Sequence, residues 1–294
     1  MKQTTSKTYR QRLTLVIDYI HQHFDSDLDV NTLAEVAMMS PYHFHRIYRE
    51  LAQETVNGTV RRLRLQRAAV ELIRSEQSLS NIAKKVSYGS LEAFSRAFTK
   101  QFGESPSDYR ETKRNRKVAN DQPFIAMLPT EKKVYDTMFT TEMMNLEATE
   151  VAFYPHQGDY MEIGAVFEKL FMYGVSQGLA SDTTRSFGLY YDDPKSIGES
   201  ELRSKACATI PADVVLKGED APEKMTIPAG RYATVLFKGS YAELNKPYDW
   251  FFGEWLPNSG HEAADFPAME EYLNDPKVTP PNELLTRIYC LLAE

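Results

Sequence analysis

Apolar residues in the first third of the chain recur at the three- and four-residue spacing of short amphipathic helices. The clearest stripe consists of Phe44, Ile47, Tyr48 and Leu51. Ser40 stands before this stripe as an N-cap, and Asn31 stands in the same way before a shorter apolar segment. The pattern therefore predicts two short helices joined by a turn.

The same helical unit occurs twice in this region. Leu33-Ala34 matches Ile82-Ala83 at an offset of 49 residues, and Phe44, Arg46 and Tyr48 match Phe94, Arg96 and Phe98 at an offset of 50. The second copy begins at the cap-like Ser80 and restarts at Ser90. Between the copies, residues 60–74 read as a helix that carries Arg61, Arg62, Arg64 and Arg67, and these side chains touch backbone phosphates, form a solvated face, or do both. The repeat predicts two helix-turn-helix units.

A second duplication lies in the rest of the chain. Gly158, Tyr160 and Glu162 match Gly239, Tyr241 and Glu243 at an offset of 81 residues. Each copy reads as strand, helix, strand, strand. The predicted segments are 150–155, 160–178, 186–192 and 206–211 in the first copy, and 232–238, 241–255, 268–274 and 286–292 in the second. The duplication predicts an α+β domain in which a pseudo-twofold pair of βαββ units brings two sheets together around a groove.

Charge is distributed unevenly between these two parts. Residues 1–120 hold 20 Lys and Arg against 13 Asp and Glu, whereas the rest hold 14 against 28, so the net charge of −7 conceals a basic part and an acidic part. The chain of 294 residues is long enough for about two domains. We expect a basic all-α domain at 8–111, a polar and charged linker at 112–132 and an α+β domain at 133–294.

Composition and motif content disfavour several classes of protein. No stretch approaches the roughly 18 apolar residues of a membrane span, so we expect a cytoplasmic chain with no membrane contact. Cys207 and Cys290 lie in apolar stretches that suit buried thiols. His156 and His261 are isolated, and neither a metal-ligand spacing nor a Ser-His-Asp or Cys-His arrangement occurs in the sequence. We therefore expect no enzyme, no metal and no cofactor.

The candidate chemistry of the helix-turn-helix units lies on the residues outside the buried stripes. These residues are Tyr42, His45, Arg46 and Arg49 in the first copy, and Glu92, Ser95, Arg96 and Thr99 in the second. A recognition helix presents its N-terminal residues to base edges in the major groove, where arginine makes a bidentate contact with guanine. A single exposed arginine is more often a solvated side chain. The coincidence of Arg46 with Arg96 in both copies favours DNA contact.

The segment LRLQRAAVELIRSEQSLSNIAKKVSYGSLEAFSRAFTKQFGESPSDYR, with its closing Phe-Gly, Pro and Tyr-Arg, is a specific signature. Through it, residues 13–110 resemble the DNA-binding domain of the AraC/XylS family of bacterial transcription regulators. The resemblance implies that two recognition helices enter successive major grooves about one turn, or ~34 Å, apart. It also implies RNA polymerase as a partner and activation as the output. The implied DNA-binding residues are Ser40, Tyr42, His45, Arg46, Ser90, Leu91, Glu92, Ser95 and Arg96.

Glu92 departs from the pattern of many relatives, which carry a neutral polar residue there. Its carboxylate either accepts a hydrogen bond from a cytosine amino group or orients Arg96, which lies one helical turn further along. Both interpretations remain open at this point.

The second duplication has a family resemblance of its own. Its signature consists of the Gly-x-Tyr before each helix, LYYDDP, IPAGRYATVLFKGSY, the helix with two tryptophans and the closing RIYCLL. Residues 133–294 thereby resemble the GyrI-like effector-binding domain, also described as a SOUL-related fold. The whole chain resembles the Rob-like arrangement, in which the DNA-binding domain precedes the sensor domain.

This second resemblance implies an effector cavity around an acidic residue at Glu270. Strand alternation places Gly188 with Tyr190 on one face and Glu270 with Tyr272 on the matching face of the other copy. A register shift of one residue would exchange Glu270 for Glu271. A carboxylate among aromatic rings suits an organic cation. The expected effector-binding residues are Glu270, Tyr154, Tyr190, Trp250, Trp255, Tyr272 and Tyr289.

The leading hypothesis is a one-component bacterial transcription regulator that binds promoter DNA through two helix-turn-helix units. A small-molecule effector in the acidic domain would control it by preferring one arrangement of the domains. One alternative is a GyrI-like hydrolase in which a carboxylate and nearby tyrosines act as acid and base. The other alternative is a protein inhibitor of the gyrase type.

Overall fold

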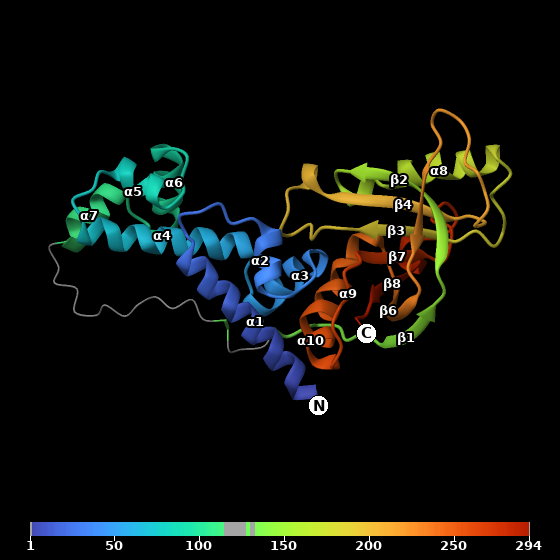
Figure 1. Cartoon of the computed structure of the whole chain (residues 1–294), viewed down its shortest axis with the longest axis horizontal. Helices are drawn as coiled ribbons and strands as arrows, with labels where there is room; N and C mark the ends of the chain where they lie inside the picture. The colour runs from blue at the N-terminus through green and yellow to red at the C-terminus, as the bar shows by residue number, and fades with distance from the viewer. Residues whose placement is uncertain (1, 115–127, 130–132, 294) are drawn as a thin grey trace.

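The computed structural model of the chain describes residues 2–114, 128–129 and 133–293 (Figure 1). Most of the predicted linker, 112–132, lies outside the described residues. Among the helices that are described, none is long and apolar enough to cross a membrane.

Seven helices form the N-terminal part of the described chain. They are α1 (Lys2–Gln22), α2 (Val30–Val36), α3 (Pro41–Ala52), α4 (Val56–Arg74), α5 (Leu79–Lys85), α6 (Leu91–Phe102) and α7 (Pro106–Arg114). The pairs α2–α3 and α5–α6 are the two predicted helix-turn-helix units, and α4 lies between them (Figure 1).

Ser40 and Ser90 are the N-caps of α3 and α6, as predicted, whereas the N-caps of α2 and α5 lie two residues before the predicted ones. Asp29, and not Asn31, caps α2, because its carboxylate accepts from the backbone N–H groups of Asn31 and Thr32. Ser78, and not Ser80, caps α5 by accepting from the N–H of Asn81. In both cases the cap-like residue chosen from sequence lies inside the first turn of the helix.

The two helix-turn-helix units belong to different cores. Phe94 and Phe98 of α6 are buried in a small core with α4 and α5. The predicted stripe of α3 is also buried, but in a core that the first unit shares with the C-terminal domain. The C-terminal members of this shared core include Tyr248, Phe252 and Ile288. The first helix-turn-helix unit and the C-terminal domain are therefore packed together.

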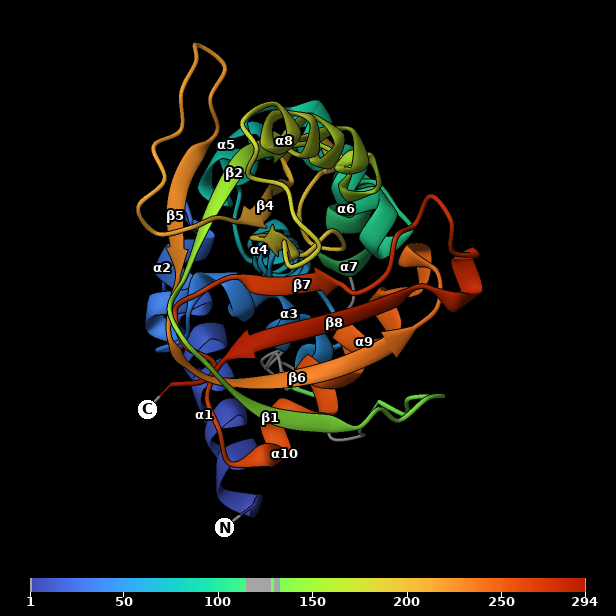
Figure 2. The same ribbon diagram turned by 90° about the vertical axis from the view of Figure 1, so that its right-hand side faces the viewer.

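The C-terminal domain is built on one antiparallel sheet of eight strands. The strands are β1 (Thr141–Leu146), β2 (Thr149–Gln157), β3 (Ser186–Tyr190), β4 (Arg203–Thr209), β5 (Glu223–Ile227), β6 (Gly230–Lys238), β7 (Ala268–Tyr272) and β8 (Leu285–Leu291). Their order in the sheet is β1-β6-β8-β7-β3-β4-β2-β5. Figure 2 shows how this sheet curls across the domain.

The strand order has the pseudo-twofold symmetry that the duplication predicts. The two copies meet where β3 pairs with β7, so their sheets join into one. The sequence did not predict β1 and β5, whose side chains are mostly partly or fully exposed and give a weak apolar alternation. Each of these strands pairs with the other copy, β1 with β6 and β5 with β2.

Helices cover the sheet in matching places. The first copy contributes η1 (Tyr160–Glu162) and α8 (Gly164–Ser176), and the second contributes η3 (Tyr241–Glu243), α9 (Asn245–Trp250), a π-helical turn η4 (Phe251–Trp255) and α10 (Leu256–Ser259). Short 3-10 turns η2 (Glu199–Glu201) and η5 (Pro281–Glu283) precede β4 and β8. The α9–η4–α10 segment packs against α1 and α3, which joins the two domains (Figure 1).

Candidate DNA-binding face and effector site

Helix α6 presents the predicted second set of DNA-binding residues to solvent. Ser90, Leu91, Glu92 and Arg96 are exposed, and Ser95 is partly exposed. Ser90 is also the N-cap, since its hydroxyl accepts from the N–H of Ala93 at 3.1 Å. Within the described part of the chain, Arg96 makes no hydrogen bond or ion pair. The guanidinium of Arg96 is therefore available to an external partner.

Helix α3 differs from α6, because the C-terminal domain covers its predicted DNA-binding face. His45 is 7% exposed and Arg46 is 5% exposed. The Ser40 hydroxyl donates to Asp265 Oδ1 at 2.8 Å, and the Tyr42 ring lies edge-on to Tyr191 at 5.6 Å between centroids. The expectation that the polar face of α3 is open to solvent is thus wrong in this arrangement. That face meets an acidic and aromatic surface of the other domain, which the local helix pattern does not show.

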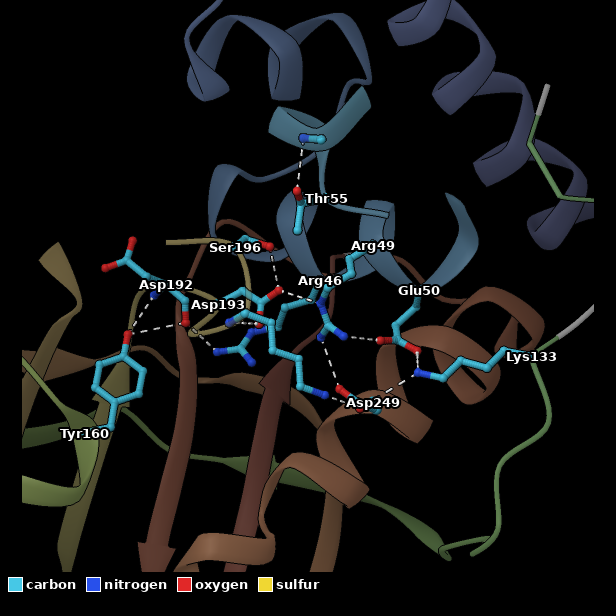
Figure 3. A network of polar contacts seen from close by, with 12 residues as sticks. Arg46, Arg49, Glu50, Thr55, Lys133, Tyr160, Asp192, Asp193, Ser196 and Asp249 are labelled. Carbon is cyan, nitrogen blue, oxygen red and sulfur yellow. Dashed lines mark hydrogen bonds and ion pairs between the residues drawn. The ribbon is translucent and has the colours of Figure 1, made fainter. Parts of the chain in front are cut away.

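A network of charged groups fixes this contact (Figure 3). Arg49 of α3 donates to Asp193 at 2.8 Å and to Asp249 at 3.1 Å, and it also pairs with Glu50. Burial opposes ionisation of Asp193, but Arg46 and Arg49 outweigh it and hold the pKa of this carboxyl below its usual range. The basic helix and the acidic domain are therefore joined by ion pairs that solvent screens little.

Lysines and a tyrosine extend the network around its edge. Lys133 donates to Glu50 at 2.7 Å, and the Tyr135 hydroxyl donates to the same carboxylate at 2.8 Å. Lys195 donates to Asp249 at 2.6 Å. Glu50, which is 4% exposed, therefore has a partner from each side of the interface.

The Asp-Asp pair of the LYYDDP segment organises the next layer of contacts. The Asp192 carboxylate is held by Arg203, whose Nε and Nη2 donate at 3.1 and 2.7 Å. The backbone carbonyl of Asp192 accepts a hydrogen bond from Arg46 Nη2 at 2.7 Å. The Tyr160 hydroxyl lies against the same backbone, accepting from the N–H of Asp192 at 3.1 Å (Figure 3).

The guanidinium of Arg46 lies between this backbone and two aromatic rings. Its Cζ is 4.6 Å from the centroid of Tyr248 and 5.8 Å from that of Phe252. Among the described residues, no acceptor is within hydrogen-bonding distance of its buried Nε. Next to it, the His43 ring stacks on Phe252 at 5.2 Å. Arg46 is thus held by cation–π contact and one carbonyl, and not by a direct carboxylate pair.

Glu270 lies immediately behind Tyr248, in a cluster of tyrosines. The hydroxyls of Tyr248 and Tyr272 donate to its two oxygens at 2.9 and 3.0 Å. The hydroxyls of Tyr190 and Tyr272 are 2.5 Å apart. Burial raises the pKa of Glu270 to about 7, although the two hydroxyls and Arg46 act in the opposite direction. This carboxyl can therefore gain or lose its charge near neutral pH.

One glycine allows the tyrosine cluster to form. Gly188 pairs with Glu270 across β3 and β7. A Cβ at position 188 would lie 2.6 Å from the Tyr190 ring, which is closer than real contacts allow. Because Gly188 has no side chain, the Tyr190 ring can lie over position 188, beside Glu270.

The structure brings together only part of the predicted effector set. Glu270, Tyr190 and Tyr272 share one site, and the register places Glu271 on the opposite face of the sheet, where Arg185 and Tyr289 bind its carboxylate. Tyr289 therefore lies with Glu271. The other three members lie elsewhere: Tyr154 beside Lys169 and Asp220, Trp250 against Phe139, and Trp255 between Phe251 and His261.

Comparisons with known proteins agree with this architecture. The profile of the GyrI-like small molecule binding domain matches residues 139–293, which is more than half of the chain. This chain belongs to the GyrI-like family. A second profile, of a helix-turn-helix domain, matches residues 33–112.

Two curated relatives and one solved structure match different parts of this GyrI-like protein. Regulatory protein SoxS of Salmonella typhimurium is 33% identical over 103 residues, covering 35% of this chain and 96% of that protein. The DNA gyrase inhibitor of Erwinia billingiae is 36% identical over 89 residues, covering 30% of this chain and 57% of that protein. The cryo-EM structure of the EcmrR-DNA complex in EcmrR-RPo is 13% identical, with a TM-score of 0.47, covering 90% of this chain and 99% of that one. The chain is thus a transcription regulator with an AraC-type helix-turn-helix domain and a GyrI-like effector-binding domain.

Sequence reasoning missed several residues of the site in this GyrI-like regulator. Tyr248 was assigned to neither the core nor the site, although it touches both Glu270 and Arg46. Asp192 and Asp193 were noted only within the LYYDDP segment of the family signature, and Asp249 not at all. One signal was available: the acidic LYYDDP segment belongs to the same chain as a basic helix that carries Arg46 and Arg49.

Proposed function

We propose that this regulator binds double-stranded promoter DNA sequence-specifically through α3 and α6. The base-reading side chains are those predicted from the sequence, Arg96 first among them. The observation that supports this most strongly is the exposed guanidinium of Arg96, which has no partner among the described residues and lies on the N-terminal half of a helix that ends a helix-turn-helix unit. Arg46 is the corresponding residue of the first unit and reaches DNA only when α3 leaves the C-terminal domain.

Selection of binding sites from random-sequence DNA by the full chain tests this proposal. Fluorescence anisotropy then compares the selected site with unrelated DNA at two salt concentrations. Replacing Arg96 with Ala removes a bidentate guanine contact of about 1–3 kcal/mol, so affinity for the selected site falls about 5- to 150-fold and the preference over unrelated DNA shrinks. Arg231→Ala, at an exposed arginine of β6, is the matched control and leaves both affinities unchanged. Equal binding by Arg96→Ala and the wild type would contradict the proposal.

The effector of this regulator, we further propose, is an organic cation that approaches Glu270. A buried carboxyl surrounded by Tyr190, Tyr248 and Tyr272 offers a counter-charge and aromatic surface together. Thermal-shift screening of organic cations against the full chain tests this. Glu270→Gln abolishes the shift, whereas Glu271→Gln, on the opposite face of the sheet, keeps it.

Transcription activation through RNA polymerase, in the bacterial cytoplasm, follows as the output of such a regulator. We propose no catalytic role for the C-terminal domain. Burial raises the pKa values of Cys207 and Cys290 to about 12, so neither thiol is a ready nucleophile. Within the described residues, no group of three or more His, Cys, Asp and Glu side chains is placed to hold a metal. Hydrolysis of aromatic esters that Glu270→Gln abolishes would contradict this statement.

A further inference from the structure

One arginine of the DNA-binding domain lies beside the proposed effector site. Arg46 belongs to α3, yet its guanidinium contacts Tyr248, Phe252 and the Asp192 carbonyl, all of which belong to the C-terminal domain. Tyr248 links Arg46 to Glu270, because its ring lies against the guanidinium of Arg46 while its hydroxyl donates to the carboxyl of Glu270 at 2.9 Å.

The surroundings of Arg46 have the features that bind a planar cation. The rings of Tyr248 and Phe252 supply cation–π attraction, and the carbonyl of Asp192 accepts a hydrogen bond from one N–H group of the guanidinium. Asp193, and Glu270 when it is ionised, supply negative charge without a direct ion pair to Arg46, since each has other hydrogen-bond donors. The site is closed to water, because Arg46 is only 5% exposed. An ammonium group, which strongly retains its hydration, suits such a site less well than a guanidinium.

We infer that the C-terminal domain contains a guanidinium-binding site next to Tyr248 and Glu270, and that Arg46 is its resident ligand. This inference rests on the proposed function, because it identifies the chemical class of effector and links it to DNA binding. A free ligand with a guanidinium or amidinium group would compete with Arg46 for the two rings and the carbonyl. Its binding would release α3, the helix that carries the first set of DNA-reading side chains.

The contacts of Arg46 are suited to exchange. A guanidinium has five N–H donors, but a single acceptor, the Asp192 carbonyl, binds Arg46 among the described residues, and the buried Nε has none. An unsatisfied buried donor costs about 1–3 kcal/mol. A free ligand can adjust its position to satisfy more donors than a side chain fixed to α3. Arg49, by contrast, is held by three carboxylates. It stabilises the arrangement in which α3 packs against the C-terminal domain, called the closed arrangement below, without entering the site.

Thermodynamic linkage gives the direction of the coupling. DNA binds the α3 face only when Arg46 is out of the site, and a free guanidinium binds only under the same condition. Each ligand therefore increases the affinity of the other by the same factor. The effect is activation of DNA binding by the effector, and not its inhibition.

The protein carries its own reporter of this exchange. Its two tryptophans, Trp250 and Trp255, both lie in the helical segment that packs against α3. Trp250 is 4% exposed, and it belongs to the core that the first helix-turn-helix unit shares with the C-terminal domain. Release of α3 therefore shifts tryptophan emission to longer wavelength.

Vacating the site and refilling it with a small probe tests the inference on the full chain. Arg46→Ala leaves space for ethylguanidinium, which reproduces the missing part of the arginine side chain. Arg46→Met removes the same charge but keeps an unbranched stem on Tyr248, so the space stays filled. Titration calorimetry should show ethylguanidinium binding Arg46→Ala about 10-fold or more tightly than it binds Arg46→Met or the wild type. Ethylammonium, with equal charge but no planar donor set, should bind none of them measurably.

Refilling the site should also restore the closed arrangement. Ethylguanidinium returns the tryptophan emission of Arg46→Ala toward the wild-type spectrum, and Glu270→Gln in the same chain weakens this effect. Equal affinity of Arg46→Ala and Arg46→Met for the probe, or no binding to either folded variant, overturns the inference. Circular dichroism identifies a variant that has not folded.

A measurement on the unaltered protein keeps the inference testable if Arg46→Ala does not fold. Ethylguanidinium should tighten binding of wild-type protein to its selected DNA relative to the same concentration of ethylammonium, and this DNA should shift tryptophan emission to longer wavelength. If the affinity of the wild-type protein for this DNA is the same with ethylguanidinium as with ethylammonium, the proposed coupling between the guanidinium site and DNA binding is overturned. If the chain binds no DNA but Arg46→Ala binds the probe, the proposed function fails and the guanidinium site stands. If the chain binds DNA but Arg46→Ala does not bind ethylguanidinium, the guanidinium site fails and the proposed function stands.

Discussion

The close approach of Gly253 to the first helix-turn-helix unit allows the domain contact to be opened without altering any proposed DNA- or ligand-binding side chain. Gly253 lies in the π-helical turn η4. A Cβ at this position would lie 1.8 Å from the Tyr135 hydroxyl oxygen and 2.9 Å from Cβ of Glu50 in α3. Inserting a methyl group into a filled space costs about 1–3 kcal/mol. If the cost falls on the closed arrangement, the open fraction rises about 5- to 150-fold, since each 1.4 kcal/mol is a factor of ten.

The matched control for Gly253→Ala is Gly174→Ala in α8. A Cβ there makes only ordinary contact, 3.9 Å from Ala180. Both changes gain helix propensity of about 1 kcal/mol, so the difference between the two variants isolates the clash. We expect Gly253→Ala, and not Gly174→Ala, to shift tryptophan emission to longer wavelength and to tighten binding to the selected DNA. Identical emission and DNA affinity in the two variants would refute the argument that α3 is held against η4.

Three further predictions concern buried polar groups. Burial, with Arg46 nearby, lowers the pKa of His43 to about 4, although Asp265 and the carbonyls of Phe266 and Ala264 act in the opposite direction. The closed arrangement is therefore fully favoured above about pH 6.5 and loses up to about 3 kcal/mol as the pH falls toward 4, so small-angle scattering should show acid-induced expansion that His43→Gln reduces. Because the pKa of Glu270 is raised to about 7, its folded state binds more protons, and the free energy of unfolding falls as the pH rises from about 4.5 to 7. Glu270→Gln should remove that decline in chemical denaturation, and a decline of the same size would show that another group causes it. Tyr48→Phe deletes a buried 2.8 Å hydrogen bond to Thr59 and should cost about 1–3 kcal/mol by denaturation, whereas an unchanged midpoint would mean that Thr59 finds another partner.

Local periodicity was sufficient to predict most of the elements and the α6 surface. The recurrence of Phe94 and Phe98 defines the buried side of that helix, so Arg96 must lie on the other side. In the same way, the two-residue period of a strand placed Glu270 and Tyr272 on one face. These predictions succeeded because both depend only on the geometry of a single element.

The environment of α3 could not be predicted in this way. The Arg46 guanidinium contacts the Asp192 carbonyl 146 residues away, and no periodic pattern encodes a contact between domains. The same limitation applies to Tyr248, whose role depends on the position of α9 over the sheet. Tyr289 was misplaced relative to Glu270 for a simpler reason: it alternates with Ile288, and Ile288, not Tyr289, is opposite Glu270 in the register.

The pairing of β1 with β6 and of β5 with β2 means that neither βαββ unit completes its own half of the sheet. Each unit lends its leading strand to its neighbour, as subunits do in a domain-swapped homodimer. Separating the two repeats would expose the edges of β2 and β6 at once, because each would lose a flanking strand. We therefore expect the two repeats to fold and unfold as one cooperative body.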